Sequence, residues 1–363
     1  MGTELIIPEF VAKAAAQFGS GAFTIVNLGN GLIHDTFRVS YEGSPDIVLQ
    51  SLNQQSFAHP ENIILNYRML IDYLQYRQEK IRIPVMVPTN EGKWFWIQEP
   101  EEDETIRFWR ATRFIRNCFS PDKAVSVAMA REAAGAYADF TKSLDGIRLD
   151  NWNFIIPDFH NLYVRYEHLE EATRQAELQR LLKATHIIAS LRERKHYVDF
   201  YLDMIQRPAD FPDRLMHHDC KINNILFDAD LHHAIAVADL DTVMPGKYFS
   251  DLGDMIRTMA CTEDENSREW EKIGVNREFY FAIIEEYGSR MSETLTEAEM
   301  AHLPEAGLLL CYMQALRFTA DYLNNDIYYK TTEPDHNLFR AFNQLILLEK
   351  LEEIHSLRAP DSK

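Results

Sequence analysis

The chain has 363 residues, of which 46% are hydrophobic and 26% charged, a composition that suits a protein with a large core rather than a disordered chain. Its 56 acidic and 37 basic residues give a formal net charge of −19, which opposes long-range attraction of DNA or RNA phosphates. No stretch approaches the roughly 20 apolar residues that a membrane span requires. We therefore expect neither a nucleic acid nor a membrane partner.

The cysteine pattern bears on the cellular compartment. Cys118, Cys220, Cys261 and Cys311 lie far apart and form no CxxC pair. This spacing argues against a disulfide framework and against a structural zinc ribbon. A reducing, cytoplasmic environment is expected.

The first third of the chain has the composition of a small antiparallel sheet. After a short helix near residues 8 to 18, the segments 23–31, 34–43 and 46–54 are rich in β-branched and aromatic residues and are bounded by Gly, Ser and Pro. A helix is expected near 60 to 79. The segment 82–115 then predicts further strands, with a turn at 90–92 and a solvated hairpin tip at the acidic run 99–104.

From Asn117 onward the pattern becomes long and helical, and only the stretch 215–248 interrupts it. We therefore expect an α+β protein with two lobes: a β-rich lobe over 1–116 and a larger, mainly helical lobe over 117–363.

The interruption contains "HHDCKINNILFD", from His217 to Asp228. It predicts a loop, a short strand at 225–227, a turn at 228–230, a second strand at 234–238 and a polar loop. Such a hairpin presents Asp219 and Asn224 on one side and Asp239 with Asp241 on the other.

Phosphoryl transfer from a nucleotide requires parts of this kind. One carboxylate accepts the proton of the attacking hydroxyl, while an amide oxygen and a second carboxylate hold magnesium on the phosphates. Asp219 and Asn224 are five residues apart, a spacing that lets a loop turn both toward one phosphate. The pair His217 and Asp219 alone would be a weak signal, but Asn224 and Asp239 make a catalytic loop the favoured interpretation. Asp241 either supports a metal ligand or only forms a turn.

The pattern His217-x-Asp219 with Asn224 and Asp239 resembles the aminoglycoside phosphotransferase and choline kinase family, whose bilobal fold is like that of protein kinases. The segments "KINNILFD", "ADLDTVMPG", "SDLGDMIR" and "LRFTADYLNNDIYY" are similar to the N-acetylhexosamine kinases of that family. This resemblance implies an ATP- and Mg²⁺-dependent enzyme of carbohydrate metabolism that phosphorylates the anomeric 1-hydroxyl of N-acetylglucosamine or N-acetylgalactosamine.

The same resemblance implies roles for residues of the helical lobe. Asp219 would be the catalytic base, Lys221 would lie beside the transferred phosphate, and Asn224 and Asp239 would bind magnesium. His217 would brace the loop rather than take part in the chemistry. Asp251 would be the buried aspartate that holds the catalytic loop in shape.

In the β-rich lobe the resemblance implies a nucleotide loop. Gly29 and Gly31 would fold over the nucleotide phosphates, because glycine permits close backbone approach. Gln50 stands where most of these kinases have a lysine on the phosphates, and the hexosamine kinases resemble this chain in that respect. A neutral amide stabilises phosphate charge less than a lysine does.

Arg317 and Asp321 are four residues apart in an apolar helical segment, so an ion pair is one interpretation. An acid placed after its base opposes the helix dipole, which makes stability a weak reason for this order. The resemblance instead places Arg317, Asp321 and Tyr328 at a sugar pocket.

Three functions remain open from the sequence. The first is a kinase of an N-acetylhexosamine or of another small alcohol such as choline, homoserine, methylthioribose or an aminoglycoside. The second is a metal-dependent phosphohydrolase built on His217, His218, Asp219 and Asp239. The third is a nucleotide-binding scaffold without catalysis. The sequence leaves the acceptor, the nucleotide donor and the oligomeric state undetermined.

Overall fold

The computed structural model describes residues 7–28, 33–75, 82–100, 105–230 and 232–357. The chain divides into two compact units, Met1–Cys118 and Phe119–Lys363, which we call unit 1 and unit 2. The boundary expected from the sequence, after residue 116, falls two residues before this division.

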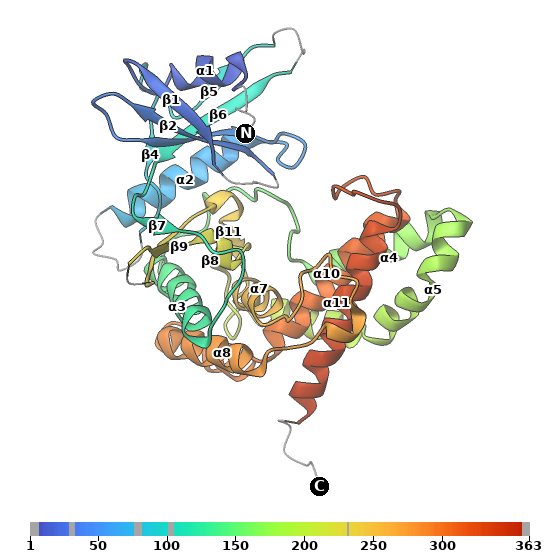
Figure 1. Cartoon of the computed structure of the whole chain (residues 1–363). Coiled ribbons are helices and arrows are strands. Elements are labelled where there is room, and N and C mark those ends of the chain that lie inside the picture. Colours follow the sequence, from blue (N-terminus) through green and yellow to red (C-terminus); the bar gives the residue numbers. More distant parts are fainter. Residues whose placement is uncertain (1–6, 29–32, 76–81, 101–104, 231, 358–363) are drawn as a thin grey trace. The chain divides into compact units, whose positions relative to one another are not determined.

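Unit 1 is built on one antiparallel sheet (Figure 1). Its strands run in the order β1-β2-β3-β6-β4, with β5 also paired to β6. Their bounds are β1 Phe23–Asn27, β2 Asp35–Tyr41, β3 Ile47–Leu52, β4 Met86–Val87, β5 Trp96–Gln98 and β6 Arg107–Arg113. Helices α1 (Glu9–Ala15) and α2 (Pro60–Leu74) complete the unit. The antiparallel sheet and both helices predicted from the sequence are confirmed; residues 101–104 of the acidic run lie outside the described residues.

The two faces of this sheet differ in chemistry because side chains alternate along each strand. Val39 and Leu49 are fully buried and form an apolar cluster with Val11 and Ala14 of α1. The opposite side of the same strands carries polar residues in register, for Thr36 lies opposite Gln50 and Gln50 lies opposite Arg110. The sheet therefore buries one face against α1 and keeps a row of polar side chains on the other.

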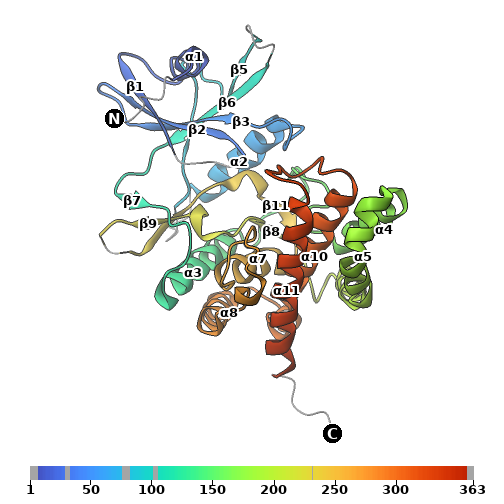
Figure 2. The same cartoon turned by 45° about the vertical axis from the view of Figure 1, so that its right-hand side comes forward.

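Unit 2 is mainly helical. Its helices are α3 Val127–Ser143, α4 Leu162–Gln175, α5 Leu178–Glu193, α6 His196–Gln206, α7 Phe249–Met259, α8 Arg277–Met291, α9 Glu297–Ala301, α10 Glu305–Leu323 and α11 His336–Ser356. Helix α10 packs against α11, α7, α4 and α5, and Figures 1 and 2 show it running beside α11. Most residues of α10 are themselves apolar and buried, as expected for a central helix that packs on most of its sides.

The predicted hairpin within unit 2 is confirmed as β9 (Ile225–Asp228) and β10 (Ala234–Val237), which pair antiparallel. The sequence analysis missed a second pair, β8 (Arg214–Met216) with β11 (Met244–Gly246). Each of these strands has only three residues, too few to show a periodic pattern. Short 3₁₀ helices occur at Ile222–Asn224, Leu240–Thr242 and Trp270–Lys272, and β7 (Cys118–Phe119) spans the division between the units. Within the described residues, no helix is both long enough and apolar enough to cross a bilayer.

The packing of α7 on α10 depends on a glycine. A Cβ added at Gly253 would lie 2.4 Å from the Ala306 backbone oxygen and 2.7 Å from Leu310 Cδ2. We expect Gly253→Ala to reduce the free energy of unfolding by about 1 to 3 kcal/mol through overpacking. The urea midpoint measures this. Gly274→Ala is the control, because its nearest new contact would be 3.6 Å, and equal midpoints for the two variants would contradict the interpretation.

Candidate active site

The loop between β8 and β9 carries the residues predicted to be catalytic, and a buried carboxylate fixes its backbone. Asp251, in the first turn of α7, is fully buried. Its Oδ2 accepts a hydrogen bond from the His217 backbone N–H at 3.0 Å, and its Oδ1 accepts one from the His218 N–H at 2.8 Å. His218 has a φ of 68°, a left-handed conformation that is uncommon outside glycine. Asp251 thus holds the turn that leads into Asp219.

His217 is buried, and both nitrogens of its ring form hydrogen bonds with the protein backbone. Its Nδ1 accepts a hydrogen bond from the Asp219 backbone N–H at 3.3 Å, which leaves Nε2 to donate to the Ala238 carbonyl at 3.0 Å. The Thr242 hydroxyl donates to the His217 carbonyl at 2.6 Å. With both ring nitrogens used in this way, the imidazole braces the loop and is a poor candidate for a metal ligand.

The Asp219 carboxylate, the predicted base, lies between two side chains of the same loop. Its Oδ1 lies 3.1 Å from Lys221 Nζ, and its Oδ2 accepts from Asn224 Nδ2 at 3.1 Å. The side chain remains 23% exposed, so a ligand can reach it. Burial alone would raise the pKa of Asp219, but the Lys221 charge and the hydrogen bonds outweigh it and lower this pKa below its usual value. Asp219 is therefore ionised at neutral pH, while its charge raises the pKa of Lys221.

Asn224 and Asp239 lie at the same end of the β9-β10 hairpin. Ile225 pairs with Val237, and the Ala238 N–H donates to the Asn224 carbonyl at 2.8 Å, so the residue after Ala238 lies beside Asn224. Because Asn224 Nδ2 is turned toward Asp219, Oδ1 is the acceptor that its amide can offer elsewhere. One amide oxygen and one carboxylate suit a hard ion that keeps waters and takes phosphate oxygens. Among the described residues, no three or more His, Cys, Asp and Glu side chains lie close enough together to hold a metal ion by themselves.

The sequence analysis missed Asp254, one turn after Asp251 in α7. Asp254 is buried, and its Oδ1 accepts from Arg257 Nε at 3.0 Å and Nη2 at 2.9 Å. Burial raises the pKa of Asp254; the Arg257 charge opposes this shift, and the charge of Asp219 adds to it. Asp254 and Arg257 are three residues apart, a spacing that predicts an ion pair within one helix and gives no sign that Asp254 lies near Asp219. Asp241, the remaining acid of this region, is buried in the 3₁₀ helix after Asp239.

In unit 1, Gln50 belongs to the polar row of the sheet. Its Oε1 accepts hydrogen bonds from Arg110 Nε at 3.1 Å and Nη2 at 2.9 Å, and its Nε2 donates to the Thr36 hydroxyl at 3.3 Å. A guanidinium from β6 thus lies against the Gln50 amide, a feature that the sequence analysis missed because register is needed to see it. Gly29 and Gly31, the predicted nucleotide loop, lie outside the described residues.

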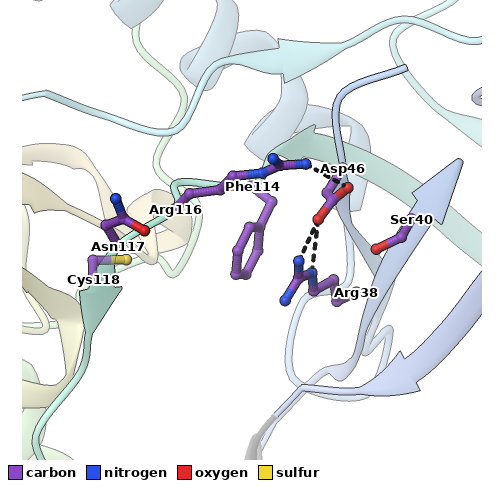
Figure 3. Close-up of a pocket in the computed structure, with 7 residues that line it drawn as sticks. All are labelled: Arg38, Ser40, Asp46, Phe114, Arg116, Asn117 and Cys118. Atoms are coloured by element: carbon purple, nitrogen blue, oxygen red, sulfur yellow. Dashed lines mark hydrogen bonds and ion pairs between the residues drawn. The ribbon is translucent and has the colours of Figure 1, made fainter. Parts of the chain in front are cut away.

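Unit 1 also has a polar cavity of about 460 Å³ (Figure 3). The Arg38 guanidinium lies 4.3 Å from the centroid of the Phe114 ring and hydrogen-bonds to Asp46, which also pairs with Arg116 at 3.1 Å. The hydrogen bond from Arg38 lowers the pKa of Asp46 most; burial opposes this shift, and Arg116 adds to it, so the pKa lies below its usual value. Such a combination of aromatic, cationic and anionic groups can bind a planar polar ring.

The three residues assigned to a sugar pocket have different environments. Asp321 is buried and accepts hydrogen bonds from the backbone N–H groups of Tyr328 at 2.8 Å and Tyr329 at 2.9 Å, and from Asn337 Nδ2 at 2.9 Å. Arg317 donates to Gln314 at 2.8 Å. Arg317 and Asp321, both among the described residues, therefore do not form the ion pair that was one interpretation of their spacing. The loop after α10 folds back, and its backbone N–H groups bind the Asp321 carboxylate instead.

Comparisons with known proteins identify the class. Residues 24–280 match the model of the phosphotransferase enzyme family, and because this match spans more than half of the chain, the chain belongs to that family. The protein is thus a phosphotransferase that acts on small molecules. This result sets aside the metal-dependent phosphohydrolase and the non-catalytic scaffold.

Solved structures show the same fold. A microcompartment-associated aminopropanol kinase superposes with a TM-score of 0.62 at 16% identity, covering 96% of this chain and 99% of that one. An aminoglycoside phosphotransferase from Alicyclobacillus acidocaldarius gives 0.60 at 12% identity, with 98% of both chains covered. An amicoumacin kinase in complex with AMP-PNP and Ca²⁺ gives 0.59 at 12% identity, covering 95% of this chain and 93% of that one. The protein-kinase-like fold expected from the resemblance is confirmed.

The contact between Lys221 and Asp219 predicts a change in pH dependence. If ionised Asp219 is required, kcat/KM falls as pH drops through its pKa. Lys221→Met removes the charge that lowers the pKa of Asp219 most. The acidic limb of the kcat/KM profile should therefore move to higher pH, in addition to any loss of rate. The pH profile of kcat/KM measures this. Lys195→Met, at the exposed N-cap of α6, should leave the limb in place. An unmoved limb in Lys221→Met would contradict the assignment.

Proposed function

We propose that the chain is an ATP- and Mg²⁺-dependent kinase of the anomeric 1-hydroxyl of an N-acetylhexosamine, N-acetylglucosamine or N-acetylgalactosamine. The phosphotransfer part of this proposal rests on one observation: a partly exposed, ionised Asp219 carboxylate held between Lys221 and Asn224 in a loop of fixed backbone. The sugar part rests on the sequence resemblance of the segments that end with Tyr328. The four separated, free cysteines support a cytoplasmic location.

In this proposal Asp219 accepts the proton of the sugar hydroxyl as that oxygen attacks the terminal phosphate of ATP. Lys221, whose charge Asp219 stabilises, lies beside the transferred phosphate and offsets its negative charge. Asn224 and Asp239 would hold Mg²⁺, which neutralises phosphate charge when bound. His217, Asp251 and Asp241 act as positioning residues that keep the loop and the hairpin end in place.

For the nucleotide, we propose that Gly29, Gly31 and Gln50 contact the phosphates. Arg110 supplies charge beside Gln50, because its guanidinium donates two hydrogen bonds to that amide. The Gln50 Nε2 group, oriented by this contact, can donate to a phosphate oxygen. The cavity beside Phe114 is large enough to take part of the nucleoside.

For the acceptor, we propose that Arg317 and Tyr328 contact the sugar directly and that Asp321 acts by holding the Tyr328 backbone. Tyr328 is 55% exposed, and Arg317 lies 5.7 Å from its ring. An alternative acceptor is another small alcohol, such as choline, homoserine, methylthioribose or an aminoglycoside. The likeness to the aminopropanol kinase fold favours keeping amino alcohols in any acceptor panel.

The base assignment is tested by Asp219→Asn. We expect kcat to fall by at least about 10²-fold, because the variant cannot accept the hydroxyl proton. ATP affinity measured by calorimetry should change little. Asp230→Asn, in the exposed turn of the same hairpin, should keep wild-type kcat. A variant Asp219→Asn with more than about a tenth of wild-type kcat would show that another group is the base.

The metal assignment predicts that Mg²⁺ binds weakly to the free protein and tightly only with ATP, because only one amide and one carboxylate are offered. Calorimetry with Mg²⁺ alone and with ATP present separates the two states. Asp239→Asn should weaken the second binding event and leave the urea midpoint nearly unchanged. Activity that survives EDTA, or tight Mg²⁺ binding without nucleotide, would refute this arrangement.

A further inference from the structure

Two arginines of unit 2 converge on one aromatic residue. Arg165, in α4, donates from Nε to the Phe159 carbonyl at 3.2 Å. Arg317, in α10, places its guanidinium 4.7 Å from the centroid of the Phe159 ring. Although they come from different helices, both side chains therefore lie against Phe159. We call Arg165, Arg317 and Phe159 the arginine cluster.

This cluster is connected to the loop that carries Asp219. The His160 ring stacks on Phe159 with centroids 4.4 Å apart, and His160 Nδ1 lies 3.3 Å from His218 Nδ1. His218 directly precedes Asp219 in the chain. Two ring contacts thus connect the arginine cluster, through His160, to His218, the residue next to the proposed base.

The two guanidiniums have no acidic partner among the described residues. Arg317 donates to the neutral amide of Gln314, and Arg165 donates to a backbone carbonyl. Asp158 acts on Arg165 through its charge, and its carboxylate accepts a hydrogen bond from Asn161 at 2.9 Å. Glu265, whose charge acts on the neighbouring Tyr329, pairs with Arg257 at 3.0 Å. Burial, together with the charge of Arg317, lowers the pKa of Arg165 to about 10. This arrangement is unusual in a chain with 56 acidic and 37 basic residues.

The cluster offers donors and few acceptors. Guanidinium groups donate hydrogen bonds and cannot accept them. The Tyr329 hydroxyl, whose ring lies 5.3 Å from Arg317, is buried and has no hydrogen-bond partner in the described part of the protein. Oxygen atoms of a ligand would satisfy these donors, whereas an ammonium group would add a third positive charge beside two.

We propose that the arginine cluster selects the acceptor by charge: it admits neutral or anionic compounds that present hydroxyl, carbonyl or carboxylate oxygens, and it excludes acceptors that carry an amine or quaternary ammonium. This inference rests on the proposed kinase function, since it assumes that the acceptor binds beside Asp219. It assigns specificity to Arg165, which no sequence pattern singled out, together with Arg317.

The test compares acceptors that differ in charge on the same skeleton. N-acetylglucosamine is paired with glucosamine, and 3,3-dimethylbutan-1-ol is paired with choline. We measure kcat/KM by ADP release, and dissociation constants by calorimetry where turnover is absent. In whichever pair the enzyme accepts, the uncharged compound should have a kcat/KM about 10- to 100-fold higher, or a dissociation constant lower by that factor, because the charged compound brings like charges together.

Variants then assign this preference to the cluster. Arg165→Gln combined with Arg317→Gln should reduce the preference to less than about threefold, while Arg165→Lys, which keeps the charge, should retain most of it. Arg174→Gln removes an exposed charge from the same helix and should leave the ratio unchanged. The ratio is measured within one variant, so a loss of folded protein does not alter it.

The outcomes separate this inference from the proposed function. If neither hexosamine reacts but dimethylbutanol is preferred over choline, the hexosamine proposal fails and charge selection stands. If glucosamine or choline is the better member of its pair, or if the double variant keeps the wild-type ratio, charge selection by the cluster is overturned. Failure of all four compounds to bind overturns it as well.

Discussion

The hydrogen bonds from two consecutive backbone N–H groups to Asp251 are the constraint on which the site depends. They fix His217 and the left-handed His218, and Asp219 follows directly. A left-handed residue other than glycine costs on the order of 1 to 3 kcal/mol, and hydrogen bonds to a buried carboxylate are strong enough to offset it. Gly246 takes part in this arrangement, because a Cβ there would lie 2.4 Å from the His218 ring. The loop geometry is therefore set by α7 and β11, which are distant from it in sequence.

Local charge matters more than net charge in this protein. The chain carries −19 overall, yet Lys221 is held among carboxylates: Asp219 raises its pKa most, and Asp239 and Asp254 add to the effect. The Lys221 ammonium in turn favours the ionised form of Asp219. In unit 1, Arg110 contributes a buried positive charge next to Gln50. In an acidic chain, these two cations are thus each held in place by a specific contact.

The sequence was informative where chemistry is encoded by neighbours along the chain. The hairpin β9-β10 could be predicted from alternation and turn residues, and the spacing of Asp219 and Asn224 is local to one loop. Contacts between distant segments could not be predicted: Arg110 meets Gln50 only through the register of β3 and β6, and His160 meets His218 only through the tertiary fold. The ion pair of Arg317 with Asp321, one interpretation of their helical spacing, does not form between these described residues, because the chain that returns after the helix contacts Asp321 instead. Backbone N–H groups of that returning chain occupy the carboxylate.

Asp251 and Asp321 anchor two different loops of unit 2 through the same type of interaction. Each is a buried aspartate on a helix, and each accepts hydrogen bonds from the backbone N–H groups of two consecutive residues in a loop. Such a carboxylate has little capacity left for a ligand, so its effect is to fix the side chains that its loop displays: Asp219 in one case, Tyr328 and Tyr329 in the other. The loop proposed for chemistry and the loop proposed for acceptor binding are therefore both anchored to the helical core. Because α7 and α10 pack against each other, a change in that packing reaches both loops at once.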